Sequence, residues 1–222
     1  QRYIIAYSFL CISVVVFVLL NIGIGSVSIS FTDILHAFSG HETDATTASI
    51  LFDIRMPRTA AVLILGGALA LAGYLLQTFF YNPIAGPFVL GISSGAKMVV
   101  ALVMVFFMKS ALSVSYADMI IAAFVGAMIS MGFVLLISKK VKNMSMLIVS
   151  GVMIGYICSA ITELVVTFAD DADIVNLHNW SQGSFSGMNW SNIRVAAVVV
   201  GLAVLFTFFL SKPISAYQLG EA

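Results

Sequence analysis

The stretch RMPRTAAVLILGGALALAGYLLQTFFYNPIAGPFVLGISSGA, from Arg55 to Ala96, decides how this chain folds. Its two arginines precede an apolar segment of about 20 residues, the length that a membrane-spanning helix needs. Asn82-Pro83 and a second proline then stop the helix, and a run rich in glycine and serine opens another apolar segment. This order predicts a charged rim, a spanning helix, a broken turn and a second spanning helix.

The composition is that of an integral membrane protein. Charged residues make up 9% of the chain and hydrophobic residues 61%, with a mean hydropathy of +1.09. An ordinary soluble domain has about 25% charged residues. The net charge is zero and the basic residues are scattered, which excludes a nucleic-acid-binding surface.

We therefore expect an all-α fold, a polytopic transmembrane helical bundle. Six segments have about the length and apolarity that a spanning helix requires: residues 3–24, 57–78, 88–108, 117–137, 146–169 and 190–210. Two longer connections, 25–56 and 170–189, join them, and the second is predicted to contain a short helix.

The distribution of lysines predicts the orientation. Lys139, Lys140 and Lys142 lie in the short connection after the fourth predicted span, and basic connections are favoured on the cytoplasmic side. Six spans put both ends of the chain on one side, so the N-terminus is expected in the cytoplasm. Arg55 and Arg58 then fall outside, which weakens the charge difference between the two sides.

Small residues recur at four-residue spacing, a pattern that lets helix backbones approach closely in lipid. The sets are Gly91 and Gly95, Gly151 and Gly155, and Ala122, Gly126 and Ser130. Gly66, Gly67 and Gly73 are expected to serve the same packing. The pattern predicts a compact bundle and indicates nothing about a substrate.

Several motifs, taken together and in order, resemble one family. They are Arg55-Met56-Pro57-Arg58, the small-residue run 66–73 with its helix ending at Gln77, the break 82–87, the segment 90–96, Ser150-Gly151-Val152 and the segment 180–184. In this order they resemble the FecCD/BtuC-like permeases of type II ABC importers, which take up iron–siderophore complexes, haem and cobalamin.

The resemblance implies a fold, partners and a location. Such permeases have about ten spans, so residues 1–222 look like a partial permease domain with six. Residues 217–222 resemble the start of the coupling helix, which assigns ATPase contact to Leu219, Gly220 and Glu221. The implied partners are an ABC ATPase subunit, an extracytoplasmic substrate-binding (lipo)protein and a second permease copy or paralogue. The implied location is the bilayer of a bacterial inner or plasma membrane.

The resemblance also assigns Arg55 and Arg58 to docking of the binding protein. Acidic residues of that protein would meet them on the extracytoplasmic face, where charge complementarity fixes register and speeds association. The alternative is that both arginines only anchor the helix at the membrane interface, or pair with Asp53.

Two further assignments concern the cytoplasmic mouth. The family's cytoplasmic gate falls on Met144 and Ser145, where apolar or small residues suit a constriction; an ordinary turn after Lys142 is the alternative. The inner loop at Asn82 and Pro83 either lies close to the pathway, since irregular backbone at membrane depth needs protein or water around it, or is a plain turn.

Lys97 falls inside the third predicted span, where a central charge costs roughly 2.5 to 3.5 kcal/mol on insertion scales. It is expected to face water, a partner helix or the pathway. A cation in the pathway would attract an anionic ferric siderophore. Snorkelling or pairing with helix ends is the alternative.

Nothing in the sequence indicates an enzyme, a cofactor or a metal site. His36, His41 and His178 lie outside the predicted spans and form no HExxH motif, and no GxxxxGK[ST] phosphate-binding motif occurs. In the family, ATP hydrolysis belongs to the partner subunit. The rival hypothesis is a secondary transporter, which would use Asn82-Pro83 as an unwound segment and Lys97 or Glu163 for ion coupling.

Overall fold

A computed structural model describes residues 2–39, 44–86, 88, 90–107, 116–140 and 144–219. Every regular element in these ranges is a helix, which confirms the expected all-α fold. Five helical segments are long and apolar enough to cross a bilayer. The third predicted span corresponds to a shorter helix, α5 (Ile92–Phe107), whose 16 residues fall below the usual spanning length of about 20.

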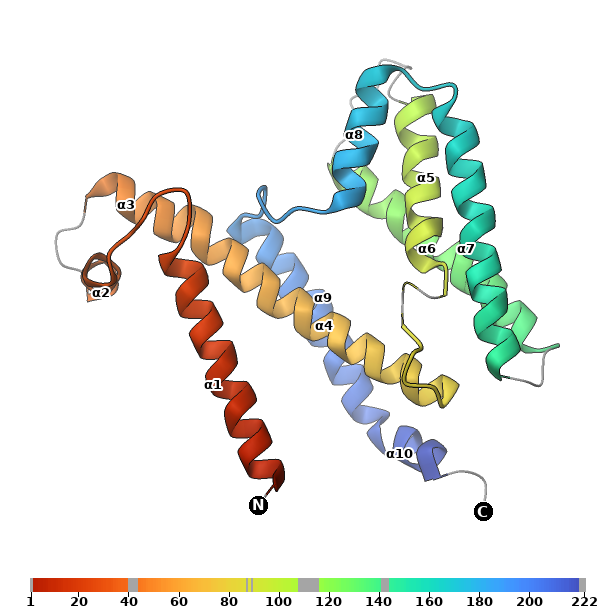
Figure 1. The fold of residues 1–222 in the computed structure, drawn as a ribbon, viewed down its shortest axis with the longest axis horizontal. Helices are drawn as coiled ribbons and strands as arrows, with labels where there is room; N and C mark the ends of the chain where they lie inside the picture. The colour runs from red at the N-terminus through yellow and green to blue at the C-terminus, as the bar shows by residue number, and fades with distance from the viewer. Residues whose placement is uncertain are drawn as a thin grey trace. The chain divides into compact units, whose positions relative to one another are not determined.

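The helices belong to two compact units, whose elements are labelled in Figure 1. The first unit comprises residues 1–69 and 185–209. Its elements are α1 (Arg2–Gly23), α2 (Phe31–Ser39), α3 (Ala45–Ser49), η1 (Ile50–Arg55), the first part of α4 (Met56–Phe80) and α9 (Trp190–Phe209). None of the residues of α1 is buried. Such an apolar exposed helix suits a lipid environment, because lipid leaves no hydrophobic drive to bury it.

The second predicted span begins earlier than its apolar pattern indicates. Helical structure runs without a break from Ala45 to Phe80, through a π-helical turn, η1, in which the Met56 amide donates to the Leu51 carbonyl five residues back. Pro57 follows at once and is fully buried. A proline ring clashes with the carbonyl four residues earlier and offers no N–H, so a widened turn lets the helix continue through it.

The second unit comprises residues 70–184 and 210–222. It holds the end of α4 together with α5, α6 (Tyr116–Ser138), α7 (Met144–Val166), α8 (Asp171–Gln182) and α10 (Ser211–Leu219). The predicted helix between residues 170 and 189 is confirmed as α8. Helix α5 is central, because it packs against α6, α7 and α8 (Figure 1). Its residues Val100, Ala101 and Met104 are almost completely buried.

Small residues bring α5 against both of its long neighbours, as their spacing predicts. A Cβ at Gly95 would lie 2.7 Å from the Gly126 carbonyl oxygen of α6 and 1.8 Å from the Ser130 hydroxyl. Gly91, in the turn before α5, has a positive φ of 71°, and a Cβ there would lie 2.8 Å from the Gly155 amide of α7. No larger residue fits at these two positions without moving a backbone.

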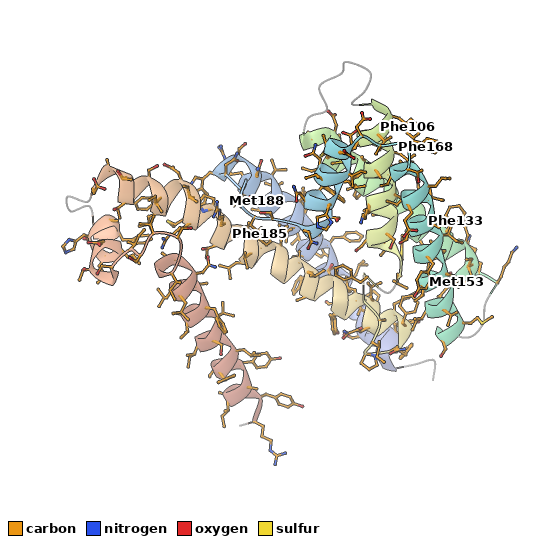
Figure 2. All side chains as sticks on the ribbon, turned by 45° about the horizontal axis from the view of Figure 1, so that its top comes forward. Phe106, Phe133, Met153, Phe168, Phe185 and Met188 are labelled. Atoms are coloured by element: carbon orange, nitrogen blue, oxygen red, sulfur yellow. The ribbon has the colours of Figure 1, made fainter. Side chains whose placement is uncertain are left out.

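The same prediction is not met by Gly66, Gly67 and Gly73. Within the described residues, a Cβ at any of the three would find no atom within 4 Å. Large apolar side chains are exposed in the second unit as well: Phe133 of α6 and Met153 of α7 are 55% and 56% exposed and project from its outer surface (Figure 2). These surfaces match the lipid or protein neighbours that a membrane bundle has.

Helix α4 ends in an unusual cap. The Asn82 amide donates to the Gln77 carbonyl at 3.2 Å and the Tyr81 amide to the Thr78 carbonyl at 3.3 Å, which is the hydrogen-bond pattern of a Schellman motif. Tyr81 occupies the left-handed position with φ of 47°, a place that glycine usually takes. The left-handed conformation costs a residue with a Cβ roughly 1 to 2 kcal/mol.

Candidate functional site

Arg55 is a structural residue in this fold. Its side chain is 8% exposed, and its guanidinium donates to the carbonyls of Ile22 at 2.5 Å, Gly23 at 3.0 Å and Val27. Because the last carbonyls of a helix have no partner within it and carry the negative end of its dipole, Arg55 caps the C-terminus of α1. Its assignment to docking stays a prediction.

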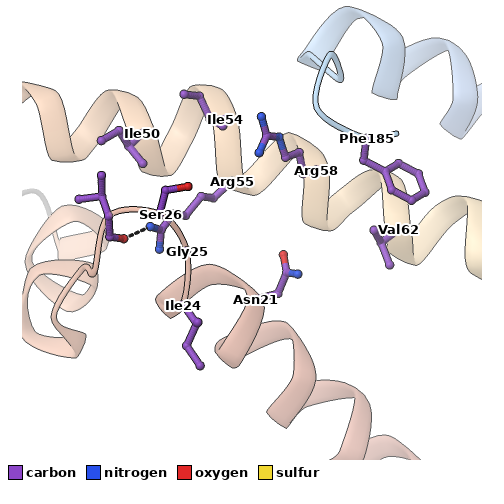
Figure 3. A pocket seen from close by; sticks show the side chains of 11 residues that line it. Asn21, Ile24, Gly25, Ser26, Ile50, Ile54, Arg55, Arg58, Val62 and Phe185 are labelled. Atoms are coloured by element: carbon purple, nitrogen blue, oxygen red, sulfur yellow. Dashed lines mark hydrogen bonds between the residues drawn. The ribbon is translucent and has the colours of Figure 1, made fainter. Parts of the chain in front are cut away.

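Arg58 is placed differently, one turn further along α4. It donates from Nη2 to the Ser186 carbonyl at 3.1 Å, while its buried Nε has no hydrogen-bond partner among the described residues. A cavity of about 520 Å³ opens beside it, with Asn21 of α1 and Phe185 on its walls (Figure 3). Arg58 thus lies at the wall of this cavity, and its docking of an acidic residue stays a prediction.

The inner loop is an ordered turn. The Asn82 side-chain oxygen accepts the Ile84 amide at 2.9 Å, and the Asn82 carbonyl accepts the Ala85 amide at 3.1 Å. Ala85 is 2% exposed, whereas Ile84 is 77% exposed. Asn82 therefore fixes the loop backbone and leaves Pro83 and Ile84 facing outward, and the proximity of the loop to a pathway stays a prediction.

The predicted gate lies at the start of α7. Met144 is the first residue of that helix, and Ser145 next to it is exposed. One turn further, Leu147 is 3% exposed and belongs to a buried cluster with Phe80, Leu90 and Val134. The two predicted cytoplasmic elements, residues 82–83 and 144–145, are thus joined through one buried apolar cluster.

Helix α10 contacts the end of α4 through two tyrosines that sequence reasoning missed. The Tyr217 hydroxyl donates to the Phe79 carbonyl at 3.1 Å, and the Tyr81 hydroxyl donates to the Tyr217 carbonyl. The Tyr217 ring stacks on Phe79 with centroids 6.2 Å apart and lies 5.1 Å from the Tyr81 ring. We call Phe79, Tyr81 and Tyr217 the tyrosine clamp.

The predicted ATPase contacts lie at the end of this helix. Leu219 is the last residue of α10, and Gly220 and Glu221 lie outside the described residues.

The environment of Tyr217 keeps its hydroxyl protonated. Desolvation raises the pKa of the Tyr217 phenol above its ordinary value of 10.0, and the neighbouring Tyr81 adds to the rise. A raised pKa in the folded chain means that the bond from Tyr217 to Phe79 persists below pH 10 and weakens only as the pH rises through the raised value. The bond from Tyr217 to Phe79 is therefore intact throughout the physiological range.

Lys97 lies in the second turn of α5 and is half-buried. The described residues give its ammonium neither a hydrogen bond nor an ion pair, and they hold no cluster of residues that could bind a metal ion. Cys158 is 6% exposed, and its sulfur lies 3.6 Å from the Ser130 hydroxyl. Cys11 is exposed.

One sequence signal could have indicated the tyrosine clamp. Tyr81 stands directly before Asn82-Pro83, at the point where a helix must end and glycine is the expected residue. Its partner Tyr217 lies 136 residues later, so no local pattern could pair the two.

Comparisons with known proteins agree with this architecture. Residues 13–222 match the sequence profile of the FecCD transport family. The chain is 29% identical over 215 residues to the hemin transport system permease protein HmuU of Yersinia pestis, covering 96% of this chain and 63% of that protein. It is 34% identical over 173 residues to the vitamin B12 import system permease protein BtuC of Escherichia coli O6:H1, covering 77% of this chain and 51% of that one.

A solved structure shares the fold. It was reported as an inward-facing conformation of an ABC transporter assigned to the metal-chelate type, and it superposes with a TM-score of 0.76 and 25% sequence identity over 95% of this chain and 63% of that one. The chain thus spans about half to two thirds of the length of the proteins it matches. Since the family profile covers nearly all of the sequence and the fold agrees with it, this chain belongs to the FecCD transport family.

Proposed function

We propose that this chain is part of the permease of an ABC importer that carries a ferric siderophore or a related metal chelate, such as haem or cobalamin, into the cytoplasm. The observation that carries the proposal is the match of residues 13–222 to the FecCD transport family. The hemin and vitamin B12 permeases among its relatives support a metal chelate as the class of cargo.

In this proposal the permease forms walls and gates and makes no chemical bonds. A substrate-binding protein delivers the cargo to the extracytoplasmic face, where Arg58 borders a cavity of about 520 Å³. The cargo then enters a cavity between two permeases, identical or paralogous. A separate ATPase subunit binds near the end of α10 and supplies the energy, and the chain lies in the bacterial inner or plasma membrane with its N-terminus in the cytoplasm.

Alternating access requires the bundle to have two packings. The glycine contacts of α5 suit such a change, because Gly91 and Gly95 place backbone against backbone and leave few interdigitated side chains to separate when helices shift. The inner loop at Asn82 and Pro83 and the start of α7 at Met144 and Ser145 are the proposed cytoplasmic gates.

The test is ATP hydrolysis by the reconstituted complex. The permease in its natural full length is assembled in lipid vesicles with its ATPase and its binding protein, and hydrolysis is measured with the binding protein empty or loaded with a ferric siderophore, haem or cobalamin. We expect loaded binding protein to stimulate hydrolysis and one of the cargoes to enter the vesicles. Uptake driven by an ion gradient in the absence of ATP would instead support a secondary transporter.

A further inference from the structure

The end of α4 combines two features that a simple helix stop does not need. A Schellman cap requires only its backbone hydrogen bonds and a residue that tolerates positive φ, and glycine meets that requirement without strain. Here Tyr81 holds the position with φ of 47°. Strained residues persist where the surrounding structure holds them, often at functional sites, so the Tyr81 side chain calls for a role beyond the cap.

That side chain forms a reciprocal contact with α10. The Tyr81 hydroxyl donates to the backbone carbonyl of Tyr217, and the Tyr217 hydroxyl donates back to the carbonyl of Phe79 at 3.1 Å. Each tyrosine thus binds the backbone of the other helix. The Tyr217 ring stacks on Phe79, and the Tyr81 ring lies beside it at a tilt of 35°. Two crossed bonds between backbones restrict sliding and rotation more than one side-chain contact does.

Tyr81 and Tyr217 of the tyrosine clamp each lie close in sequence to an element with a proposed role. Tyr217 lies two residues before Leu219, the described end of α10 and a predicted ATPase contact. Tyr81 directly precedes the inner loop at Asn82. Next to Phe79, Phe80 is 1% exposed and packs in the buried cluster that contains Leu147 near the start of α7.

We propose that the tyrosine clamp joins α10 rigidly to the end of α4, so that a displacement of α10 moves the inner loop and the start of α7 with it. Tyr81 and Tyr217 are then positioning residues that connect ATP hydrolysis to opening of the cytoplasmic mouth. The inference rests on the proposed function, because it assumes that an ATPase acts on α10.

The decisive substitution is Tyr81→Gly. If Tyr81 served only as a helix cap, glycine would do as well or better, because it adopts positive φ without strain. If the side chain transmits movement, Tyr81→Gly folds and assembles but loses coupling. Tyr81→Phe and Tyr217→Phe each remove one hydroxyl and keep the ring. Tyr7→Phe is the matched control, since Tyr7 on α1 is 67% exposed.

The measurement is the number of cargo molecules imported per ATP hydrolysed, in vesicles holding the full-length permease, its ATPase and its binding protein. For Tyr81→Gly we expect hydrolysis to remain stimulated by loaded binding protein, while the transport ratio falls at least about fivefold, the lower range of a typical coupling between sites. The transport ratio also falls in Tyr81→Phe and in Tyr217→Phe, whereas Tyr7→Phe keeps the wild-type ratio.

A cross-link separates rigid connection from simple contact. Tyr81→Cys and Tyr217→Cys are combined in a chain whose Cys11 and Cys158 are replaced by serine, and a short bifunctional thiol reagent joins the pair. We expect the permease with the unlinked cysteine pair to hydrolyse ATP with a low transport ratio. We expect the cross-linked permease to regain the wild-type transport ratio, because the clamp does not need to open during the cycle.

Three results would overturn the inference alone: a wild-type ratio in Tyr81→Gly, transport blocked by the cross-link, or loss of ATPase assembly in all clamp variants. The last would make the tyrosines part of the docking surface. Absence of any ATP-driven uptake by the wild-type complex would overturn the proposed function, and the inference with it.

Discussion

Arg55 and Arg58 show that one short motif can hold two different roles. The motif Arg55-Met56-Pro57-Arg58 suggests two equivalent docking residues, but the structure uses Arg55 to cap the C-terminus of α1 and leaves the Arg58 Nε without a partner among the described residues. The two side chains point in different directions, because a separation of three residues rotates a side chain by about 300° around the helix axis.

Removing each arginine therefore has a different expected effect. Arg55→Ala leaves the last carbonyls of α1 unpaired in a partly buried site, which costs roughly 1 to 3 kcal/mol, and we expect a lower melting temperature of the purified full-length permease. Arg58→Glu changes little in the fold, because among the described residues the Arg58 side chain donates to the Ser186 carbonyl alone. We expect it to weaken binding of the substrate-binding protein at least about tenfold, through like-charge repulsion.

Surface plasmon resonance with the binding protein and thermal unfolding measure the two effects on the same preparations. The docking role of Arg58 would be refuted by equal affinity of Arg58→Glu and wild type. Equal melting temperatures of Arg55→Ala and wild type would contradict the capping role.

Lys97 gives a further prediction at this scale. Its ammonium is half-buried in α5 with no hydrogen bond or ion pair in the described structure, so a role in the pathway remains open to test. If it attracts an anionic chelate, Lys97→Met slows uptake of a negatively charged ferric siderophore and leaves uptake of a neutral chelate unchanged. Equal uptake of both cargoes by variant and wild type would leave Lys97 a snorkelling residue.

Residue types and their spacing predicted which side chains carry charge or break a helix, but not what each one contacts. Arg55 was recognised as important, yet its partners lie in the segment from Ile22 to Val27, whose position depends on how the chain turns after α1. Tyr81 and Tyr217 were missed because each looks ordinary in its own segment. Pairing across a hundred residues or more is a property of the fold and leaves no trace in a single sequence.

At the scale of elements, close helix packing in the second unit depends on particular glycines. Gly95 and Gly126 face each other so closely that a Cβ at Gly126 would lie 2.2 Å from the Gly95 carbonyl oxygen. Gly132, on the same helix α6, has no atom within 4 Å of such a Cβ. The two positions of α6 thus form a natural comparison of packed and open glycine.

We expect Gly126→Ala to separate α5 from α6 and to destabilise the permease by about 1 to 3 kcal/mol, the usual cost of overpacking. Gly132→Ala adds the same methyl group to the same helix and leaves stability unchanged or slightly raised, because alanine favours helix over glycine. Thermal unfolding in detergent, with transport in vesicles as a second readout, compares the two. Equal loss of stability in both variants would contradict the role of close approach.

Apolar length predicted where the long apolar helices lie, and it failed where polar residues continue a helix. Residues 45–55 were expected to be part of a connection because Thr46, Asp53 and Arg55 interrupt the apolar pattern. They are helical because the π-turn before Pro57 keeps the helix continuous. Conversely, α5 is shorter than the apolar run from 88 to 108, since the turn at Gly91 delays its start until Ile92.

At the scale of the whole molecule, the orientation in the membrane is the most direct quantity to test. Lys140 is exposed in the turn after α6, and Asp171 is exposed at the start of α8. We expect Lys140→Cys to react with a membrane-impermeant thiol reagent only when the cytoplasmic side is accessible, and Asp171→Cys to react from outside. The measurement compares intact cells with inside-out vesicles, after Cys11→Ser removes the exposed native thiol. Reversed labelling would place the N-terminus outside the cell.

The π-turn at Ile50–Arg55 also constrains how the length of this segment can vary. A π-turn accommodates one residue more than an α-turn, so deleting a single residue there would force ordinary α-helical geometry against the ring of Pro57, which clashes with the carbonyl four residues before it. The Phe52 carbonyl, which accepts the Trp190 indole N–H at 2.9 Å, lies in the same turn and would shift with it. The number of residues in this turn is therefore as important as their identity.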